Sequence, residues 1–178
     1  MMELFAHDLL SQQQQMQFPQ IDIAVTRKPY FVDKAAEIDL SGVYPSSVEQ
    51  VHLTGYDTLV RIFNPKYYPP EHTLQPLVPF LSQHRLQVTM RPSEELGGQE
   101  EQRRFLLDLA QGGRASEGGR PEWAERIQLV EGERPQDQSV SSTRAREAIQ
   151  QQNMGFLDGL VPTRVREFLL QETPYAEA

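Results

Sequence analysis

The sequence predicts an α/β fold built on a doubly wound, Rossmann-like parallel sheet. Short β-branched or alternating runs recur along the chain, and longer amphipathic runs separate them. A glycine directly follows one of these short runs and leads into a helical pattern, as at a strand-to-helix junction. With 178 residues the chain is long enough to bury its own core, so we expect one domain over residues 1–178.

The predicted elements alternate along the chain. Strands are predicted at residues 21–25, 48–54, 86–90 and 127–130. Helices are predicted at residues 2–16, 34–38, 76–84 and 99–110, with another that begins near Thr58. In the last of the numbered helices, Phe105, Leu106 and Leu109 are expected to face the core. Stretches rich in proline or glycine are predicted loops at residues 41–47, 64–70 and 112–121. Four glycines make the region near 111–121 the best candidate for a flexible insertion.

Composition excludes several classes of protein. The net charge of −8 argues against a general nucleic-acid binder, which would carry a basic face. The chain has no cysteine, so we expect no disulfide framework, and we predict no metal ion held by the protein itself. The longest apolar runs are too short to span a membrane, and no secretory signal pattern opens the sequence. We therefore expect a soluble intracellular protein that binds neither nucleic acid nor membrane, with its oligomeric state left open.

The residues from Ser141 to Arg146 carry the clearest chemical signal. Ser141, Ser142 and Thr143 precede a run of good helix formers, so each qualifies as the N-cap. The first turn then holds Arg144 and Arg146, where acidic residues would complement the positive end of the helix dipole. Hydroxyls, free backbone amides and arginines together describe a phosphate site. The alternative is an ordinary exposed helix start with two solvated arginines.

This stretch resembles a known signature. The motif ISSTxxR of the nicotinamide/nicotinate mononucleotide adenylyltransferase family is similar to residues 140–146, with Val140 in place of isoleucine. The closing helix of that family, entered through a Val-Pro step and ending near a tyrosine, resembles residues 160–169, with Tyr175 as the tyrosine. The resemblance implies that the triphosphate of ATP, acting with Mg²⁺, is held by Ser141, Ser142, Thr143 and Arg146.

A glycine and an aspartate follow the predicted strand at residues 48–54, in the tripeptide Gly55-Tyr56-Asp57. One account is a common strand-to-helix junction in which Asp57 is the N-cap. The other is that Gly55 lets a ligand approach the backbone while Asp57 accepts a hydrogen bond from a ribose hydroxyl. The family carries a GxD at this place in its order of elements, so the resemblance implies that Gly55 and Asp57 belong to the ATP-binding set.

Four further residues are candidates for contacts with a substrate. Tyr67 and Tyr68, in the proline-rich loop, either form a platform for a flat ring or pack the loop itself. In the family an aromatic residue shortly after the GxD, typically tryptophan, stacks on the nicotinamide ring, so tyrosine is a departure here. Lys28 and Arg91 each follow a predicted strand, at the edge where open α/β sheets bind ligands. Lys28 either meets a phosphate there or is a solvated loop residue.

One element of the family is missing from this sequence. The family opens with a strand that leads into a GxFxPxHxxH-type motif, whose histidines stabilise the α-phosphate. This chain opens with a predicted helix, contains no GxFxP, and has none of its four histidines at HxxH spacing. The catalytic residues are therefore unknown, and the resemblance covers residues from about 18 to the end. We expect a sheet that lacks its first strand, in an N-terminally truncated sequence.

The resemblance implies a nicotinamide-nucleotide adenylyltransferase of NAD biosynthesis, located in the cytoplasm or nucleus. Its reaction transfers AMP from ATP to nicotinamide mononucleotide and yields NAD and pyrophosphate. The missing motif implies that this chain is impaired in that reaction. Two alternatives stay open: another nucleotidyltransferase of the superfamily, using CTP or a different acceptor, and a non-catalytic nucleotide-binding protein.

Overall fold

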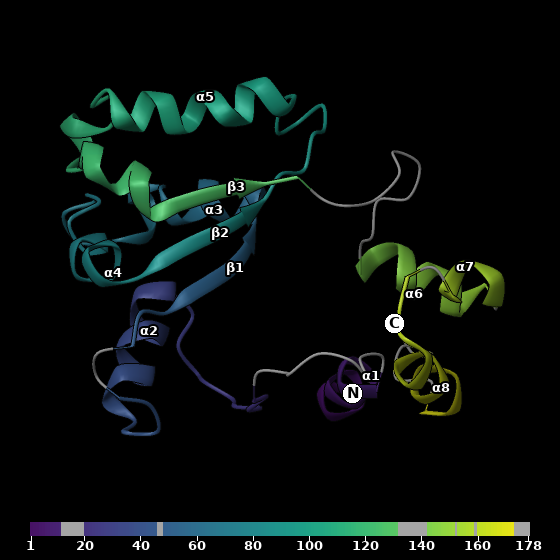
Figure 1. Cartoon of the computed structure of the whole chain (residues 1–178). Helices are drawn as coiled ribbons and strands as arrows, with labels where there is room; N and C mark the ends of the chain where they lie inside the picture. Colours follow the sequence, from purple (N-terminus) through teal and green to yellow (C-terminus); the bar gives the residue numbers. More distant parts are fainter. Residues whose placement is uncertain (12–19, 46–47, 132–141, 152, 159, 173–178) are drawn as a thin grey trace. The chain divides into compact units, whose positions relative to one another are not determined.

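The structure, a computed structural model, describes residues 1–11, 20–45, 48–131, 142–151, 153–158 and 160–172 (Figure 1). The chain divides into two compact units. One, which we call the sheet unit, spans Thr26–Glu133, and the other, the helical unit, combines Met1–Val25 with Arg134–Ala178. The single domain over residues 1–178 and the flexible insertion near 111–121 stay predictions.

Strands and helices alternate in the sheet unit. Its strands are β1 (Val51–Gly55), β2 (Arg85–Thr89) and β3 (Ile127–Val130). Its α-helices are α2 (Phe31–Leu40), α3 (Tyr56–Ile62), α4 (Leu77–Gln83) and α5 (Gln99–Ala110), and its 3-10 helices are η1 (Pro65–Tyr67), η2 (Ala115–Glu117) and η3 (Pro121–Arg126). The strands form one parallel sheet in the order β1-β2-β3. This architecture confirms the predicted α/β class and is consistent with a Rossmann-like fold.

The core of the sheet unit is centred on β2. Leu86 and Val88 of this strand are 1% and 0% exposed. Large side chains from the surrounding helices join them in one hydrophobic cluster, among them Leu59, Phe63, Leu77, Phe80, Leu81, Leu109 and Trp123. The ring of Phe63 meets those of Phe105 and Trp123 edge-on, at centroid distances of 5.4 and 6.1 Å. Each buried side chain of this size stabilises the fold by roughly 1.5–3 kcal/mol relative to exposure.

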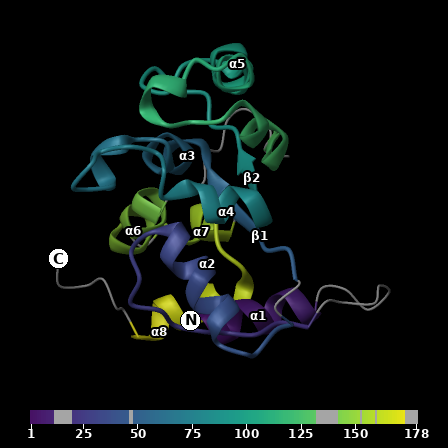
Figure 2. The same ribbon diagram turned by 90° about the vertical axis from the view of Figure 1, so that its left-hand side faces the viewer.

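The helices of the sheet unit contribute to this core on one face of the sheet. In Figure 1, α5 lies above β3 and α2 lies below β1. Figure 2 again shows α5 and α2 on opposite sides of the strands. Val51 and Leu53, which alternate with the inward-facing His52, are 51% and 74% exposed. Helices on both faces, as in a doubly wound sheet, and the missing first strand therefore stay predictions.

The described residues of the helical unit form four helices, apart from residues 20–25, which have no regular secondary structure, and from short connections. The helices are α1 (Met2–Ser11), α6 (Ser142–Gln150), α7 (Met154–Asp158) and α8 (Thr163–Glu172). Helix α1 packs against α8, and α6 packs against α7. Across the part of the chain that the structure describes, no helix combines the length and the apolar character needed to cross a membrane.

The side chain of Asp8 on α1 contacts the start of α8. Its side chain is 8% exposed, and its Oδ2 accepts a hydrogen bond from the backbone N–H of Arg164 at 2.9 Å. The other oxygen, Oδ1, lies 3.5 Å from Nε of the same arginine. The first N–H groups of a helix have no partner within it, and a negative charge there complements the helix dipole. Asp8 of α1 therefore caps the amino end of α8.

The strand predicted at residues 21–25 is wrong. The structure gives this segment no regular secondary structure, and Ile21, Ile23 and Val25 are 36%, 47% and 95% exposed. A short alternating run becomes a strand only when a neighbour accepts its hydrogen bonds, and none of the described strands does so. Because residues 21–25 form no strand, Lys28 does not lie at the carboxyl end of one.

Most other elements lie close to their predicted positions. The helix at residues 99–110 and the strand at residues 127–130 have the predicted bounds, and Leu109 is buried while Phe105 and Leu106 are partly buried. Strand β1 is shorter at its start than predicted, and α2 is longer than residues 34–38. The described part of the first helix reaches Ser11, and the rest of its predicted range, to residue 16, lies outside the described residues.

We expect Asp8→Ala to destabilise the helical unit by about 1–2 kcal/mol, because it removes a helix cap and leaves a free N–H at the start of α8. Hydrogen exchange of the amides in the first turn of α8 is the direct measurement. Glu3→Ala, an exposed acidic residue on the same helix, is the matched control. Equal protection of the Arg164 amide in both variants would contradict the capping role.

Candidate functional site

Gly55 and Asp57 lie at the carboxyl edge of the sheet, where β1 passes into α3. Gly55 is the N-cap of α3 and Asp57 is in the first turn, so the account in which Asp57 is the N-cap does not hold. A Cβ on Gly55 would lie 2.6 Å from Oδ1 of Asp57 and 3.4 Å from Cδ of Arg91. Glycine at residue 55 thus lets two charged side chains lie against the backbone.

Arg91 follows β2 and reaches the same place. Its Nη1 lies 3.7 Å from Oδ1 of Asp57, and the two side chains are 48% and 35% exposed. A loose, partly hydrated ion pair of this kind contributes little to stability. It does place an acceptor suited to a hydroxyl next to a guanidinium suited to a phosphate.

Tyr67 and Tyr68 have different environments. Tyr68 is buried, and its hydroxyl donates to the carbonyl of Ile62 at 2.7 Å. Burial, with smaller effects of Tyr30 and Asp33, raises the pKa of Tyr68 to about 12. Tyr67 is only half-buried, and Nζ of Lys66 lies 4.8 Å from its ring centroid. Of the pair, Tyr67 therefore has the more accessible ring.

Lys28 is exposed in the segment before α2, and its backbone N–H donates to the Oγ1 of Thr26 at 3.1 Å. Thr26 in turn donates to Glu37 of α2. The structure thus places Lys28 in the sheet unit, beside α2 rather than at the end of a strand.

The helix predicted after the hydroxyl-rich stretch is confirmed as α6, which begins at Ser142. Ser141 and Tyr175 lie outside the described residues, and Thr143 belongs to the first turn. Arg146 is exposed. Arg144 is half-buried, with its guanidinium 4.7 Å from the ring centroid of Phe156 on α7. Arg144 thus contributes a cation–π contact to the packing of α6 on α7.

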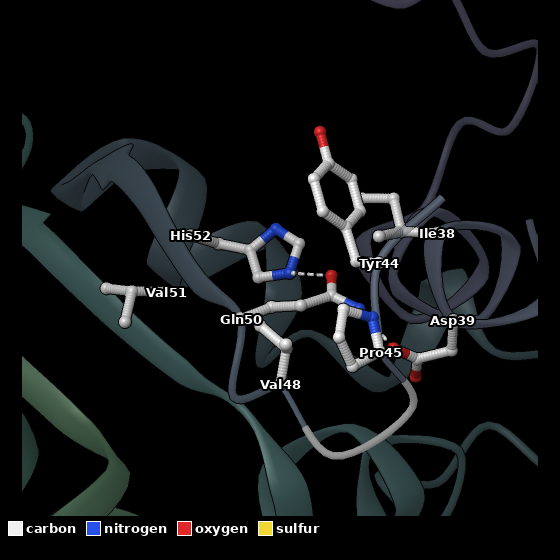
Figure 3. Close-up of a pocket in the computed structure, with 8 residues that line it drawn as sticks. All are labelled: Ile38, Asp39, Tyr44, Pro45, Val48, Gln50, Val51 and His52. Carbon is white, nitrogen blue, oxygen red and sulfur yellow. Dashed lines mark hydrogen bonds between the residues drawn. The ribbon is translucent and has the colours of Figure 1, made fainter. Parts of the chain in front are cut away.

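A second polar group lies beside the amino half of β1 (Figure 3). Figure 3 shows three of its members, Gln50, His52 and Asp39 of α2. The fourth, His84 at the end of α4, is hydrogen-bonded to Asp39. Nε2 of Gln50 donates to Oδ1 of Asp39 at 2.7 Å and to the carbonyl of Ala35 at 3.0 Å. Asp39, Gln50 and His52 also line a cavity of about 320 Å³. The remaining lining residues are largely apolar: Ile38, Tyr44, Pro45, Val48 and Val51.

Hydrogen bonding fixes the proton positions in this group. The backbone N–H of Gln50 donates to Nδ1 of His84 at 3.2 Å, so the His84 proton is on Nε2, which faces Oδ2 of Asp39 at 3.2 Å. The side-chain nitrogen of Gln50 already donates, so its Oε1 accepts from Nε2 of His52 at 3.1 Å. Each buried donor in the group is thus paired with an acceptor.

Burial lowers the pKa of His52 below its ordinary value of 6.5, and the nearby His84 and Lys34 lower it further, while Asp39 acts in the opposite direction. The rings of Phe31 and Phe80 flank it at centroid distances of 5.7 and 5.1 Å. The folded chain therefore disfavours the protonated imidazole more than the unfolded chain does.

We expect the stability of the sheet unit to fall as pH drops below 6.5, because His52 takes up its proton more readily in the unfolded chain. The slope from one such group is at most about 1.4 kcal/mol per pH unit. Urea unfolding between pH 8 and pH 5 measures it, with His52→Gln expected to flatten the slope. The exposed His72→Asn is the control. Identical slopes for both variants would rule out His52 as the source.

Sequence reasoning missed two features of the sheet unit. One is the group formed by Asp39, Gln50, His52 and His84, whose members are distant in sequence and carry no shared motif. The other is Gln102, which is 0% exposed and hydrogen-bonds the backbone of Arg91. Among the described residues, no cluster of three or more His, Asp or Glu could hold a metal ion.

No family model and no solved structure matches the chain. A curated protein of Schizosaccharomyces pombe, named "Putative nicotinamide mononucleotide adenylyltransferase", is 33% identical to it over 131 residues. The match covers 72% of this chain and 49% of the relative, so the chain spans about half the length of the relative it matches. This similarity supports the same family as the resemblance carried by residues 140–146.

Proposed function

We propose that the chain is a nucleotidyltransferase of the nicotinamide-nucleotide adenylyltransferase type, whose reaction transfers AMP from ATP to nicotinamide mononucleotide, and that this chain is impaired in that reaction. The observation that carries the proposal is the 33% identity to a relative whose name states this activity. The parallel α/β sheet, with Gly55 and Asp57 at its carboxyl edge, is the support from the structure. A location in the cytoplasm or nucleus is part of the proposal.

In this reaction a phosphate oxygen of the mononucleotide attacks the α-phosphorus of ATP. A new P–O–P linkage forms, the bond to the β-phosphate oxygen breaks, and pyrophosphate leaves. No covalent protein intermediate is required, so the protein contributes alignment and charge stabilisation. Mg²⁺ enters with the ATP phosphates, because this ion keeps several waters and is held largely by the phosphates of its substrate.

The proposed roles of the residues follow their chemistry. Asp57 accepts hydrogen bonds from a ribose hydroxyl, and Gly55 allows the sugar to approach the backbone. Arg91, next to Asp57, pairs with a nucleotide phosphate. Tyr67 rather than the buried Tyr68 stacks on the nicotinamide ring, and Lys28 is a candidate for the mononucleotide phosphate.

The ATP triphosphate is assigned to the start of α6. Ser141, Ser142 and Thr143 supply hydroxyls there, and the amino end of the helix supplies free amides. Arg146, which is exposed, supplies the charge, as the resemblance to the ISSTxxR motif implies.

We expect Arg146→Ala to weaken ATP binding by roughly 1.5–3 kcal/mol, the scale of a charge-assisted hydrogen bond. Isothermal titration calorimetry with Mg-ATP is the measurement, and circular dichroism checks that the variant folds. Arg104→Ala removes the same charge from an exposed site on α5 and is the matched control. Equal ATP affinity of the two variants would remove the assignment of Arg146.

The function itself is tested by NAD formation and by nucleotide binding together. We expect the 178-residue chain to bind ATP and nicotinamide mononucleotide but to form little or no NAD, because its sequence has no HxxH pair to stabilise the α-phosphate as pyrophosphate leaves. Loss of one preorganised donor costs about 10²–10³ in rate. A coupled dehydrogenase assay for NAD is the measurement, with an active adenylyltransferase as positive control.

The outcomes separate the candidate functions. Turnover by this chain would confirm the proposed function and contradict the expectation of impaired catalysis. Binding without turnover is the expected result. Binding of CTP in preference to ATP would favour another member of the superfamily. Failure to bind any of these nucleotides would overturn the proposal.

A further inference from the structure

We propose that Gln102 is a positioning residue, which holds Arg91 so that its guanidinium is placed for contact with a nucleotide phosphate at the carboxyl edge of the sheet. The inference rests on the proposed function, because it assumes that a nucleotide binds beside Asp57 and Arg91. It concerns a residue that acts through another residue and does not itself touch the ligand.

The side-chain amide of Gln102 pairs with the backbone of Arg91 in the way that a residue of a neighbouring strand would. Its Oε1 accepts from the backbone N–H of Arg91 at 3.0 Å, and its Nε2 donates to the carbonyl of Arg91 at 2.9 Å. One carboxamide thus satisfies both backbone groups of a residue that lies beyond the end of β2 and has left the sheet pairing. Because the side chain of Gln102 is 0% exposed, water does not compete for these bonds.

The same carboxamide also contacts the far end of the loop that begins at Arg91. Nε2 of Gln102 also lies 3.4 Å from the carbonyls of Leu96 and Gly97. Ser93 and Gly97 form an isolated antiparallel bridge across that loop. Gln102 therefore holds the first and last residues of the loop together, and losing its amide would release Arg91.

The position of Arg91 matters because its guanidinium stands at the end of a long side chain. Each freely rotating backbone or side-chain torsion costs entropy when a ligand orders it. With the backbone of Arg91 fixed, its Cδ is held near Gly55 and its Nη1 near Asp57. A nucleotide then meets a guanidinium that is already placed, which is the condition for tight and specific phosphate contact.

A double-mutant cycle with Gln102→Leu and Arg91→Ala is the main test, with Mg-ATP and nicotinamide mononucleotide as probes. Each single change should weaken at least one of the two nucleotides about five- to tenfold, the range of a weakened charge-assisted contact. If Gln102 acts through Arg91, Gln102→Leu should have no further effect in the Arg91→Ala background. A full, additive loss there would overturn the inference and leave the proposed function intact.

Leu109→Ala is the matched control for lost stability. Leu109 is also 0% exposed and lies on the same helix, α5, but in the hydrophobic core. We expect it to lower the melting temperature and to leave nucleotide affinity unchanged at low temperature, where the chain stays folded. An equal loss of affinity in Leu109→Ala would show that Gln102 affects binding only through the stability of the fold, and would overturn the inference.

Gln102→Glu provides a second variant, in case the leucine variant does not fold. An ionised glutamate has no proton to donate to the Arg91 carbonyl, whereas a protonated glutamic acid can both donate and accept. Affinity relative to the parent chain should therefore be weakest at pH 8 and recover toward pH 6, since burial favours the protonated acid. A pH-independent ratio would overturn the inference. Absence of nucleotide binding by the parent chain would overturn it together with the proposed function.

Discussion

Pairing of β2 with both of its neighbours is the constraint on which the candidate site depends. The parallel register aligns Gly55 with Thr89 and Thr89 with Val130, so the three strands end together at one edge. Burial of Leu86 and Val88 in the core prevents β2 from sliding by one residue, because a slip would turn both side chains to the opposite face. Asp57 and Arg91 meet at this edge because each follows the end of its strand.

The two polar groups along β1 are built in opposite ways. Beside its amino half, Gln50 links Asp39, His52 and His84, and the donors and acceptors satisfy one another within the protein. Such a closed network specifies packing and leaves little hydrogen-bonding capacity for a ligand. At the carboxyl end the contact between Asp57 and Arg91 is long, and both side chains are partly exposed. Polar groups in that state can exchange water for a ligand at low cost.

The sequence predicted the elements that depend on residues close to one another in the chain. The helix after Ser141 and the helix at residues 99–110 were predictable, because hydroxyl residues and apolar spacing act within a few residues. The strand at residues 21–25 was not, because its pattern was adequate but its partner had to come from elsewhere. The account of Asp57 as an N-cap failed because Asp is the stronger capping residue in isolation, whereas Gly55, the last residue of β1, is itself the N-cap of α3.

Side chains that act over long distances in the sequence could not be identified in advance. Gln102 and His84 have the sequence context of ordinary helix and helix-end residues, yet both are almost wholly buried and hydrogen-bonded to other segments. Their partners, Arg91 and Gln50, are specified by the tertiary fold. A single sequence contains no record of such pairings.

The bond between Asp8 and Arg164 has a consequence for how the protein is made. On a ribosome the chain emerges from its amino end, so α1 is synthesised long before α8. The sheet unit lies wholly between them in sequence and can form its contacts first. Helix α1 must meanwhile stay unpartnered by α8, with Phe5 and Leu9 of its ten residues at least partly exposed even in the finished fold. An isolated helix of this length is marginally stable in water. We therefore expect α1 to become stably helical only after α8 has left the ribosome.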